Sequence, residues 1–272
     1  MTELLHYDVD GDGPVLLVVP GGAGHPMGFD KLTDALADRF TVVTYDPLGL
    51  AHGRLGEPVV DQRVAEWSDG ARQVLDEVLP KGESACVLGT SSGGIAALDL
   101  LARHPERLSH VVAHEPPCVG VLPDGALQQA VFREVYDTYR AAGLPAAAVR
   151  LGAALTGQEA AEPTGGQPLS RNEELASPMA LFLAHVLRQF SSYAPDLAAL
   201  AASPARLTLA AGSDSRGQLL HRTAEFLAER TGSRFVEFPG GHVGVAEHPV
   251  AFAELLAETL SAGDGPRAPL TT

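Results

Sequence analysis

A serine between two glycines is the part of the sequence best suited to chemistry. Gly89, Ser91 and Gly93 fit the pattern G-x-S-x-G, which follows an apolar run ending at Leu88 and precedes a helical pattern. A strand–turn–helix of this kind turns so tightly that side chains two residues before or after the serine would collide. The turn raises the hydroxyl at the carboxyl edge of a sheet, beside the N-terminus of the new helix. Ser91 is therefore a candidate nucleophile, whereas Ser92 lies one residue too late.

A serine nucleophile needs a base, and His242 is well placed to supply one. It follows the run Arg234–Phe238 in a glycine-rich loop near the end of the chain. A neutral imidazole can take the hydroxyl proton and return it to a leaving group near pH 7. His248 is the competitor, but His248-Pro249 has the pattern of a helix start.

The elements that must position these residues alternate along the chain. Seven short apolar runs are mostly continuous, as expected for strands buried on both faces. Helical patterns separate most of them, which predicts a doubly wound, mostly parallel α/β sheet. The expected strands are Leu4–Val9, Val15–Val19, Thr41–Tyr45, Ala85–Leu88, His110–His114, Arg206–Ala211 and Arg234–Phe238. The expected helices of this core are Phe29–Arg39, Asp61–Leu79, Ile95–Arg103, Gln218–Thr231 and His248–Leu260.

The alternation breaks once, over residues 117–200, which we interpret as a helical cap or lid. Residues 1–116 and 201–262 then form the core, and residues 263–272 are expected to be a disordered tail. Gly157–Ser170 is typical of a flexible loop inside the cap. The expected cap helices are Asp124–Ala142, Pro145–Thr156 and Arg171–Tyr193.

With the serine turn and the terminal histidine in this order, the chain resembles the α/β-hydrolase fold family over nearly all of residues 1–262. In that family an early strand ends in a glycine-rich turn that supplies an oxyanion donor. Here Pro20 begins that turn, where some members have histidine. The resemblance implies that the backbone N–H groups of Gly22 and Ser92 form an oxyanion hole. His25, on the same loop, is a candidate for lining the substrate pocket.

The residues leave two candidates for the acid that would orient His242. The family's usual acid stands three residues after the glycine that matches Gly212, but that position is Ser215, and Asp214 lies one residue earlier. Glu115 ends the preceding strand, where some haloalkane dehalogenases and lipases of this fold carry their acid. A carboxylate at the end of a buried strand needs a partner. Asp214 could instead cap a turn or helix, and Glu115 could form a plain salt bridge. Both stay open, with a slight preference for Glu115.

Composition and missing motifs exclude several other classes of partner. With 19 Lys and Arg against 34 Asp and Glu, the net charge is −15, which repels nucleic acids and anionic membranes. No signal peptide or membrane span is recognisable, and two cysteines make no disulfide framework. We therefore expect a reduced cytoplasmic protein, monomeric or homodimeric, that binds neither nucleic acid nor membrane. Neither a P-loop, a complete dinucleotide fingerprint nor a metal-binding histidine motif is present, so we expect no cofactor and no metal.

The leading hypothesis is a serine hydrolase that cleaves an ester, thioester or lactone of a small, largely neutral substrate through an acyl-enzyme. Few basic residues are expected near the site, which disfavours a strongly anionic substrate. One alternative is a non-hydrolytic enzyme of the same fold: a C–C hydrolase, a cofactor-free oxygenase or haloperoxidase, or a natural-product cyclase. A further alternative is a ligand-binding protein with a vestigial triad, against which the intact Ser91 and His242 argue.

Overall fold

A seven-stranded sheet forms the centre of the protein. The computed structural model describes residues 5–22, 29–47, 49–51, 56–158 and 166–262. The strand order is β1-β3-β2-β4-β5-β6-β7, in which β1 pairs antiparallel with β3 and the other pairs are parallel. The predicted fold class is confirmed, and each expected run forms a strand. The strands are β1 (His6–Asp10), β2 (Val15–Val19), β3 (Thr41–Asp46), β4 (Ala85–Thr90), β5 (Leu108–His114), β6 (Leu207–Gly212) and β7 (Arg234–Phe238).

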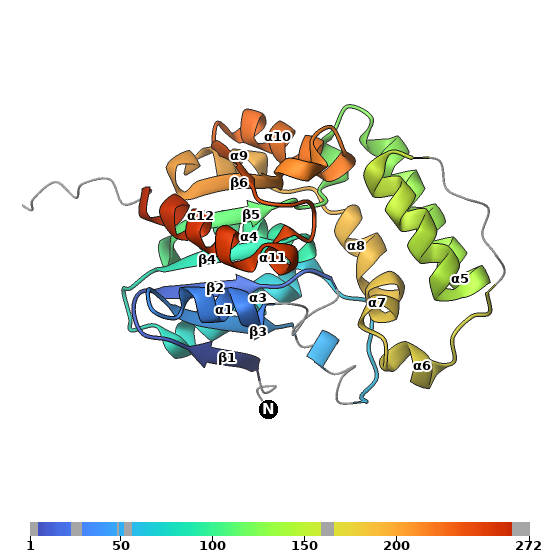
Figure 1. Cartoon of the computed structure of the whole chain (residues 1–272), viewed down its shortest axis with the longest axis horizontal. Helices are drawn as coiled ribbons and strands as arrows, with labels where there is room; N and C mark the ends of the chain where they lie inside the picture. The colour runs from blue at the N-terminus through green and yellow to red at the C-terminus, as the bar shows by residue number, and fades with distance from the viewer. Residues whose placement is uncertain (1–4, 23–28, 48, 52–55, 159–165, 263–272) are drawn as a thin grey trace, which may run out of the picture.

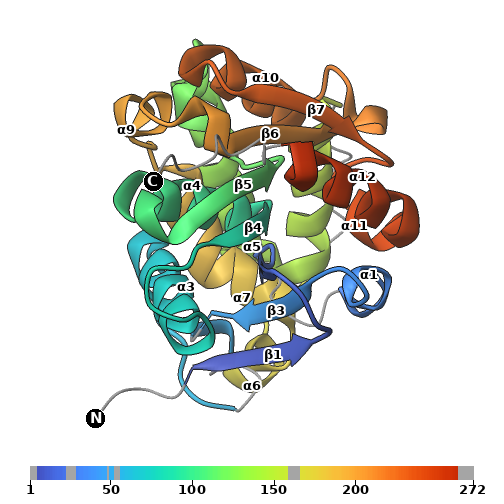
Figure 2. The same cartoon turned by 90° about the vertical axis from the view of Figure 1, so that its left-hand side faces the viewer.

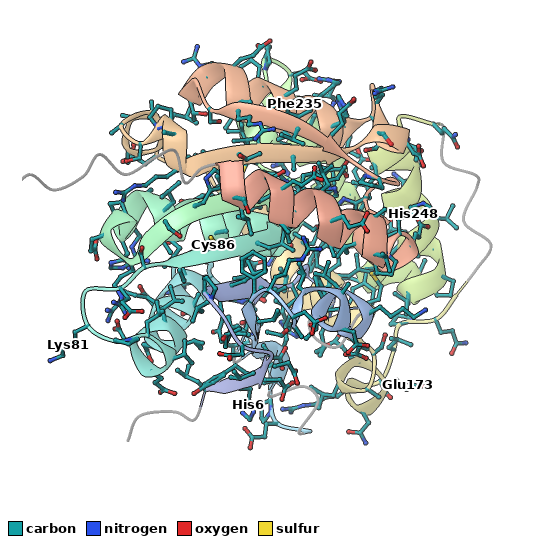
Figure 3. All side chains as sticks on the ribbon, turned by 60° about the vertical axis from the view of Figure 1, so that its left-hand side comes forward. His6, Lys81, Cys86, Glu173, Phe235 and His248 are labelled. Atoms are coloured by element: carbon teal, nitrogen blue, oxygen red, sulfur yellow. The ribbon has the colours of Figure 1, made fainter. Side chains whose placement is uncertain are left out.

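Helices cover both faces of this sheet, on opposite sides of it in Figure 2. Alternate side chains of a strand pack against the helices on opposite faces of the sheet. Leu17 packs in the hydrophobic core beneath α3, α4 and α10, and Leu16 packs in the core beneath α1 and α12. This two-sided burial explains why the strand runs are continuously apolar. Charged side chains such as Lys81 and Glu173 project from the surface of the protein into solvent (Figure 3). The helices are α1 (Asp30–Leu36), α3 (Val64–Val78), α4 (Ser92–Arg103), α10 (Leu219–Thr231), α11 (Gly244–Glu247) and α12 (Pro249–Ala262).

Between β5 and β6, the described part of the chain is helical. In Figure 1, α5 to α8 stand beyond the carboxyl ends of the parallel strands, whereas α9 returns to the layer of α10. We call α5 to α8 the cap. The elements are η2 (Val119–Val121), α5 (Gly125–Thr156), α6 (Arg171–Leu175), α7 (Pro178–Leu181), the π-helical turn η3 (Phe182–Val186), α8 (Leu187–Ser191), α9 (Leu197–Ala201) and η4 (Pro204–Arg206).

The prediction of one continuous helix over Arg171–Tyr193 is wrong. The chain breaks at Ser177, whose backbone is extended and whose side chain accepts a hydrogen bond from the N–H of Ala180, with Pro178 at the first helical position. The π-helical turn follows, and the carbonyl of His185 there accepts a hydrogen bond of 2.8 Å from the backbone N–H of Gln62. Gln62, in a core segment distant in sequence, therefore binds the cap at the turn where the helical hydrogen bonds of the cap are irregular.

Some expectations fall on residues outside the described ranges. These include the tail 263–272, the centre of the Gly157–Ser170 loop and His25, the candidate for lining the pocket. Across the described residues, we find no helix with the length and apolar character needed to cross a membrane.

The kink in α5 offers a test of the cap's backbone. Gly143 has φ +78°, and a Cβ there would lie 2.2 Å from the carbonyl oxygen of Gln167. We expect Gly143→Ala to lower the free energy of unfolding by at least about 1 kcal/mol, because strain and collision act together. Gly152 on the same helix has open space where a Cβ would lie, so Gly152→Ala should raise the free energy of unfolding by roughly 0.5 kcal/mol. Urea unfolding of both variants measures this, and equal effects would contradict the assignment of the kink.

Candidate active site

Ser91 occupies the turn between β4 and α4, in a backbone conformation that few residues adopt. Its φ is +52° and its ψ −121°, and only Ser91 and Glu115 among the described non-glycine residues have positive φ. A Cβ on Gly89 would lie 2.4 Å from the carbonyl oxygen of Gly93, and one on Gly93 would lie 2.1 Å from that of Val19. The glycines of the G-x-S-x-G pattern are therefore required by close backbone approach.

The structure brings His242 to Glu115. His242 Nδ1 lies 2.7 Å from Glu115 Oε2, and Glu115 has no exposed surface. The backbone N–H of Gly212 donates to Glu115 Oε1 at 3.0 Å, and the Ser215 hydroxyl donates to the same oxygen. Three donors from two segments, the loop after β7 and the end of β6 with the turn that follows it, therefore surround one buried carboxylate.

These donors explain why Glu115 stays ionised. Burial alone would raise its pKa, but the hydrogen bonds from His242 and Ser215 and the nearby imidazoles favour the charged form. Together they lower the pKa of Glu115 from 4.5 to about 2. A negative charge next to Nδ1 stabilises a proton on His242 when one arrives at the other ring nitrogen.

Asp214, the other candidate acid, lies elsewhere. Its backbone N–H donates to the carbonyl of Gly240 at 3.0 Å, and its carboxylate accepts from the neighbouring Ser213 hydroxyl at 3.4 Å. Within the described structure no hydrogen bond joins Asp214 to His242. The structure therefore places Glu115, and not Asp214, in the position to orient the histidine.

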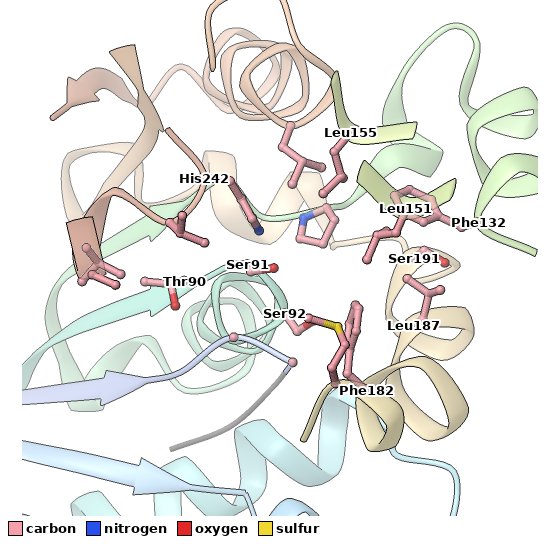
Figure 4. A pocket seen from close by; sticks show the side chains of 18 of the residues that line it. Thr90, Ser91, Ser92, Phe132, Leu151, Leu155, Phe182, Leu187, Ser191 and His242 are labelled. Atoms are coloured by element: carbon pink, nitrogen blue, oxygen red, sulfur yellow. The ribbon is translucent and has the colours of Figure 1, made fainter. Parts of the chain in front are cut away.

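Ser91 and His242 line one cavity of about 540 Å³ between the sheet and the cap. In Figure 4, His242 points from its loop towards Ser91. His242 is the only titratable side chain among the described lining residues. The remaining polar side chains are short hydroxyls, and most of the wall is apolar. The apolar lining includes Phe29, Phe132, Leu151, Leu155, Met179, Phe182, Leu187, Leu220, Val243 and Val245.

The candidate oxyanion groups also border this cavity. Gly22 and Ser92 both line it, and Ser92 is the first residue of α4, so its N–H has no partner within the helix. A Cβ on Gly22 would lie 2.1 Å from the ring of Phe182. The cap therefore contacts the glycine-rich turn directly, and His25 of the same loop lies outside the described residues.

Sequence reasoning missed the contributions of Ser215 and Phe182. Ser215 stands where the family's usual acid would be expected, and its hydroxyl donates to the carboxylate of Glu115. Phe182 was one of many apolar cap residues, and nothing in its local sequence distinguishes it. Among the described residues, no cluster of three or more His, Cys, Asp or Glu has the arrangement of a metal site.

With this geometry in view, the chain can be compared with known proteins. Residues 15–255 match the profile of the alpha/beta hydrolase family. The chain belongs to that family. The uncharacterized hydrolase YraK of Bacillus subtilis (strain 168) is 32% identical over 262 residues, which cover 94% of this chain and 92% of that protein.

One further relative of this α/β-hydrolase and one solved structure extend the comparison. A zearalenone hydrolase from Bionectria ochroleuca is 26% identical, over 93% of this chain and 92% of that protein. The structure of a thermophilic esterase from Thermogutta terrifontis superposes with a TM-score of 0.66 at 17% identity, covering 96% of this chain and 94% of that chain. The structural match shows a shared fold, as the strand order already indicates.

His114, next to Glu115 in this α/β-hydrolase, is a buried imidazole. It has no exposed surface, and neither ring nitrogen meets a partner among the described residues. Its ring packs edge-on against Phe238 and Phe252, at centroid distances of 6.1 and 5.3 Å. Burial lowers the pKa of His114 from 6.5 to about 4, against the attraction of Glu115. The ring is therefore neutral and acts as an apolar packing group near pH 7.

This burial predicts a pH-dependent stability. Because the folded pKa of His114 lies below the unfolded value, the unfolded state binds the proton first, and stability falls as the pH drops from 6.5 towards 4. We expect His114→Leu to change the free energy of unfolding little at pH 7. Near pH 4.5, the free energy of unfolding of the variant should exceed that of wild type by about 2–3 kcal/mol. Urea titrations at a series of pH values measure this, and parallel curves for the two proteins would refute it.

Proposed function

We propose that this α/β-hydrolase is a serine hydrolase that works by acyl transfer. The observation that carries the proposal is the buried, ionised Glu115 on Nδ1 of His242, beside a serine in a strained turn on the same cavity. A nucleophile, a base and a group that orients the base are the parts that acyl transfer needs. A ligand-binding protein has no need for a strained serine or for a buried charge.

Each part has a defined role in the proposed reaction. Ser91 Oγ attacks the substrate carbonyl while His242 Nε2 accepts its proton, and Glu115 stabilises the imidazolium that results. The N–H groups of Gly22 and Ser92 stabilise the negative charge that develops on the carbonyl oxygen. His242 then protonates the leaving alcohol or thiol. Water attacks the acyl-enzyme with His242 as base, which releases the acid and restores Ser91.

The cavity favours a neutral, largely apolar substrate. The described residues of its wall include no lysine or arginine to pair with a charged group, and burying an unpaired charge there would be costly. A volume of about 540 Å³ lies within the range of small-molecule pockets. Esters, thioesters and lactones with an apolar body fit both the chemistry and the space.

The first test is covalent labelling by a fluorophosphonate, followed by intact mass. Wild type should gain one adduct, and Ser91→Ala should gain none, because only an activated serine attacks the phosphorus. The wild type should also hydrolyse a neutral hexanoyl ester faster than the matching monoester of adipic acid. A folded wild type that remains unlabelled would count against an active serine and favour non-hydrolytic chemistry.

A matched pair of variants tests the assignment of the acid. Glu115→Gln keeps the size of the side chain but removes the charge at Nδ1, so kcat should fall by roughly 10³–10⁴-fold, the scale seen when a triad acid becomes an amide. Asp214→Asn should remain within about twofold of wild type, because its side chain has no bond to His242. Steady-state kinetics, measured on variants whose circular dichroism matches that of wild type, tests this assignment. A large loss of kcat in Asp214→Asn with little change in Glu115→Gln would make Asp214 the group that orients His242.

A further inference from the structure

The side chain of Phe182 joins the cap to the glycine-rich turn that follows β2. The three atoms nearest to a Cβ built on Gly22 all belong to the ring of Phe182, and none of them lies farther than 3.0 Å from that Cβ. Both residues line the catalytic cavity, and Figure 4 shows Phe182 and His242 on different sides of it. A cap side chain therefore touches the backbone that carries one of the two proposed oxyanion donors.

On its other side, the same turn packs against the nucleophile. A Cβ on Gly21 would lie 3.3 Å from the Cβ of Ser91. No backbone hydrogen bond joins Gly21 or Gly22 to another residue that the structure describes. Packing between Ser91 and the ring of Phe182 is therefore what holds this stretch of backbone in place.

The ring itself is held firmly from the side of the cap. Phe182 packs against the hydrophobic core beneath α3, α4 and α10, and also against the hydrophobic cluster of the cap. It begins the turn η3, in which the carbonyl of His185 accepts the hydrogen bond from the N–H of Gln62. The imidazole of His185 lies 3.2 Å from the carboxylate of Asp61 and 3.4 Å from that of Glu174. These contacts fix η3 relative to the core, and the ring of Phe182 with it.

Resting on the proposed function, we propose that Phe182 is a positioning residue for the oxyanion hole. Its ring supports Gly22 from the cap side and keeps the N–H of Gly22 directed at the carbonyl oxygen of the substrate. A donor stabilises the developing charge best when it is placed before the reaction, because no free energy is then spent on moving it. The cap thus supplies part of the catalytic geometry as well as the apolar wall.

A double variant tests the contact, because the nearest atoms at position 22 all belong to the ring. Gly22 is not among the described glycines with positive φ, so its backbone conformation is open to alanine. In Gly22→Ala the new methyl group collides with the ring, and kcat should fall about 100-fold as the turn or the ring shifts. Phe182→Ala alone should lower kcat about tenfold. The double variant should return to about the level of Phe182→Ala, instead of the roughly 1,000-fold loss that independent effects would give.

Two matched ligands separate positioning from simple packing. In 1,1,1-trifluorooctan-2-one, Ser91 Oγ bonds to the carbonyl carbon, the π pair moves to the carbonyl oxygen, and the serine proton moves to His242. The resulting negative oxygen occupies the oxyanion hole. The corresponding alcohol, 1,1,1-trifluorooctan-2-ol, has a similar shape but forms no adduct. By fluorine NMR, Phe182→Ala should bind the ketone about tenfold or more weakly than wild type, and the alcohol no more than about threefold more weakly.

Phe132→Ala is the matched control for this pair of ligands. Phe132 of α5 also lines the cavity with an aromatic ring, but none of its atoms is among the three nearest to a Cβ on Gly22. Its removal should weaken the binding of ketone and alcohol by the same factor. Phe182→Leu keeps most of the apolar volume and should show the imbalance of Phe182→Ala in reduced size, which guards against a variant that fails to fold. Urea unfolding checks the fold of every variant.

The outcomes separate this inference from the proposed function. Equal weakening of ketone and alcohol by Phe182→Ala and Phe182→Leu, or multiplying losses in the double variant, would overturn Phe182 as a positioning residue and leave the serine hydrolase intact. A wild type that binds the ketone no more tightly than the alcohol, and takes no fluorophosphonate, would reject the proposed function. It would also remove the oxyanion hole that Phe182 is proposed to position.

Discussion

The buried negative charge of Glu115 is the constraint on which the rest of the site depends. A carboxylate with no exposed surface is stable only when donors replace the water it has lost. The donors here are His242, after β7, and Gly212 and Ser215, at the end of β6 and in the turn that follows it. They meet because β5, β6 and β7 are neighbours in a parallel sheet and end at one edge. The order of the strands thus determines where a charge can be buried.

This constraint also shows why part of the site could be predicted from the sequence. Ser91 was recognisable because its turn needs glycines at fixed local spacings, and the strands were recognisable from continuous apolar runs. The choice between Glu115 and Asp214 had no local signal, because it depends on which strand end faces His242. A hydroxyl at position 215 was compatible with either choice until its partner was known.

The cap shows the same division between local and distant causes. Its helical content follows from periodicity, and the Ser177-Pro178 step is a local sign of a break, because proline favours the first position of a new helix. The π-helical turn had no such sign, since the carbonyl of His185 is bound by the N–H of Gln62 from the core. That turn begins at Phe182, whose ring fills the space that a side chain on Gly22 would need. The irregular turn, the aromatic ring and the glycine therefore form one unit that no single local pattern reveals.

The distribution of polarity across the cap ties these parts to chemistry. Phe132 of α5 and Leu187 of α8 line the catalytic cavity, whereas their neighbours Arg133 and Arg188 are exposed, so the charged side chains of these helices lie outside the described cavity wall. An uncharged wall strengthens the interaction between Glu115 and His242, because little competing polarity surrounds them. The same wall is a poor environment for any carboxylate that acyl transfer would produce. In the proposed reaction, such a site would match its neutral substrate better than its anionic product, and that mismatch would help to drive the product out of the cavity.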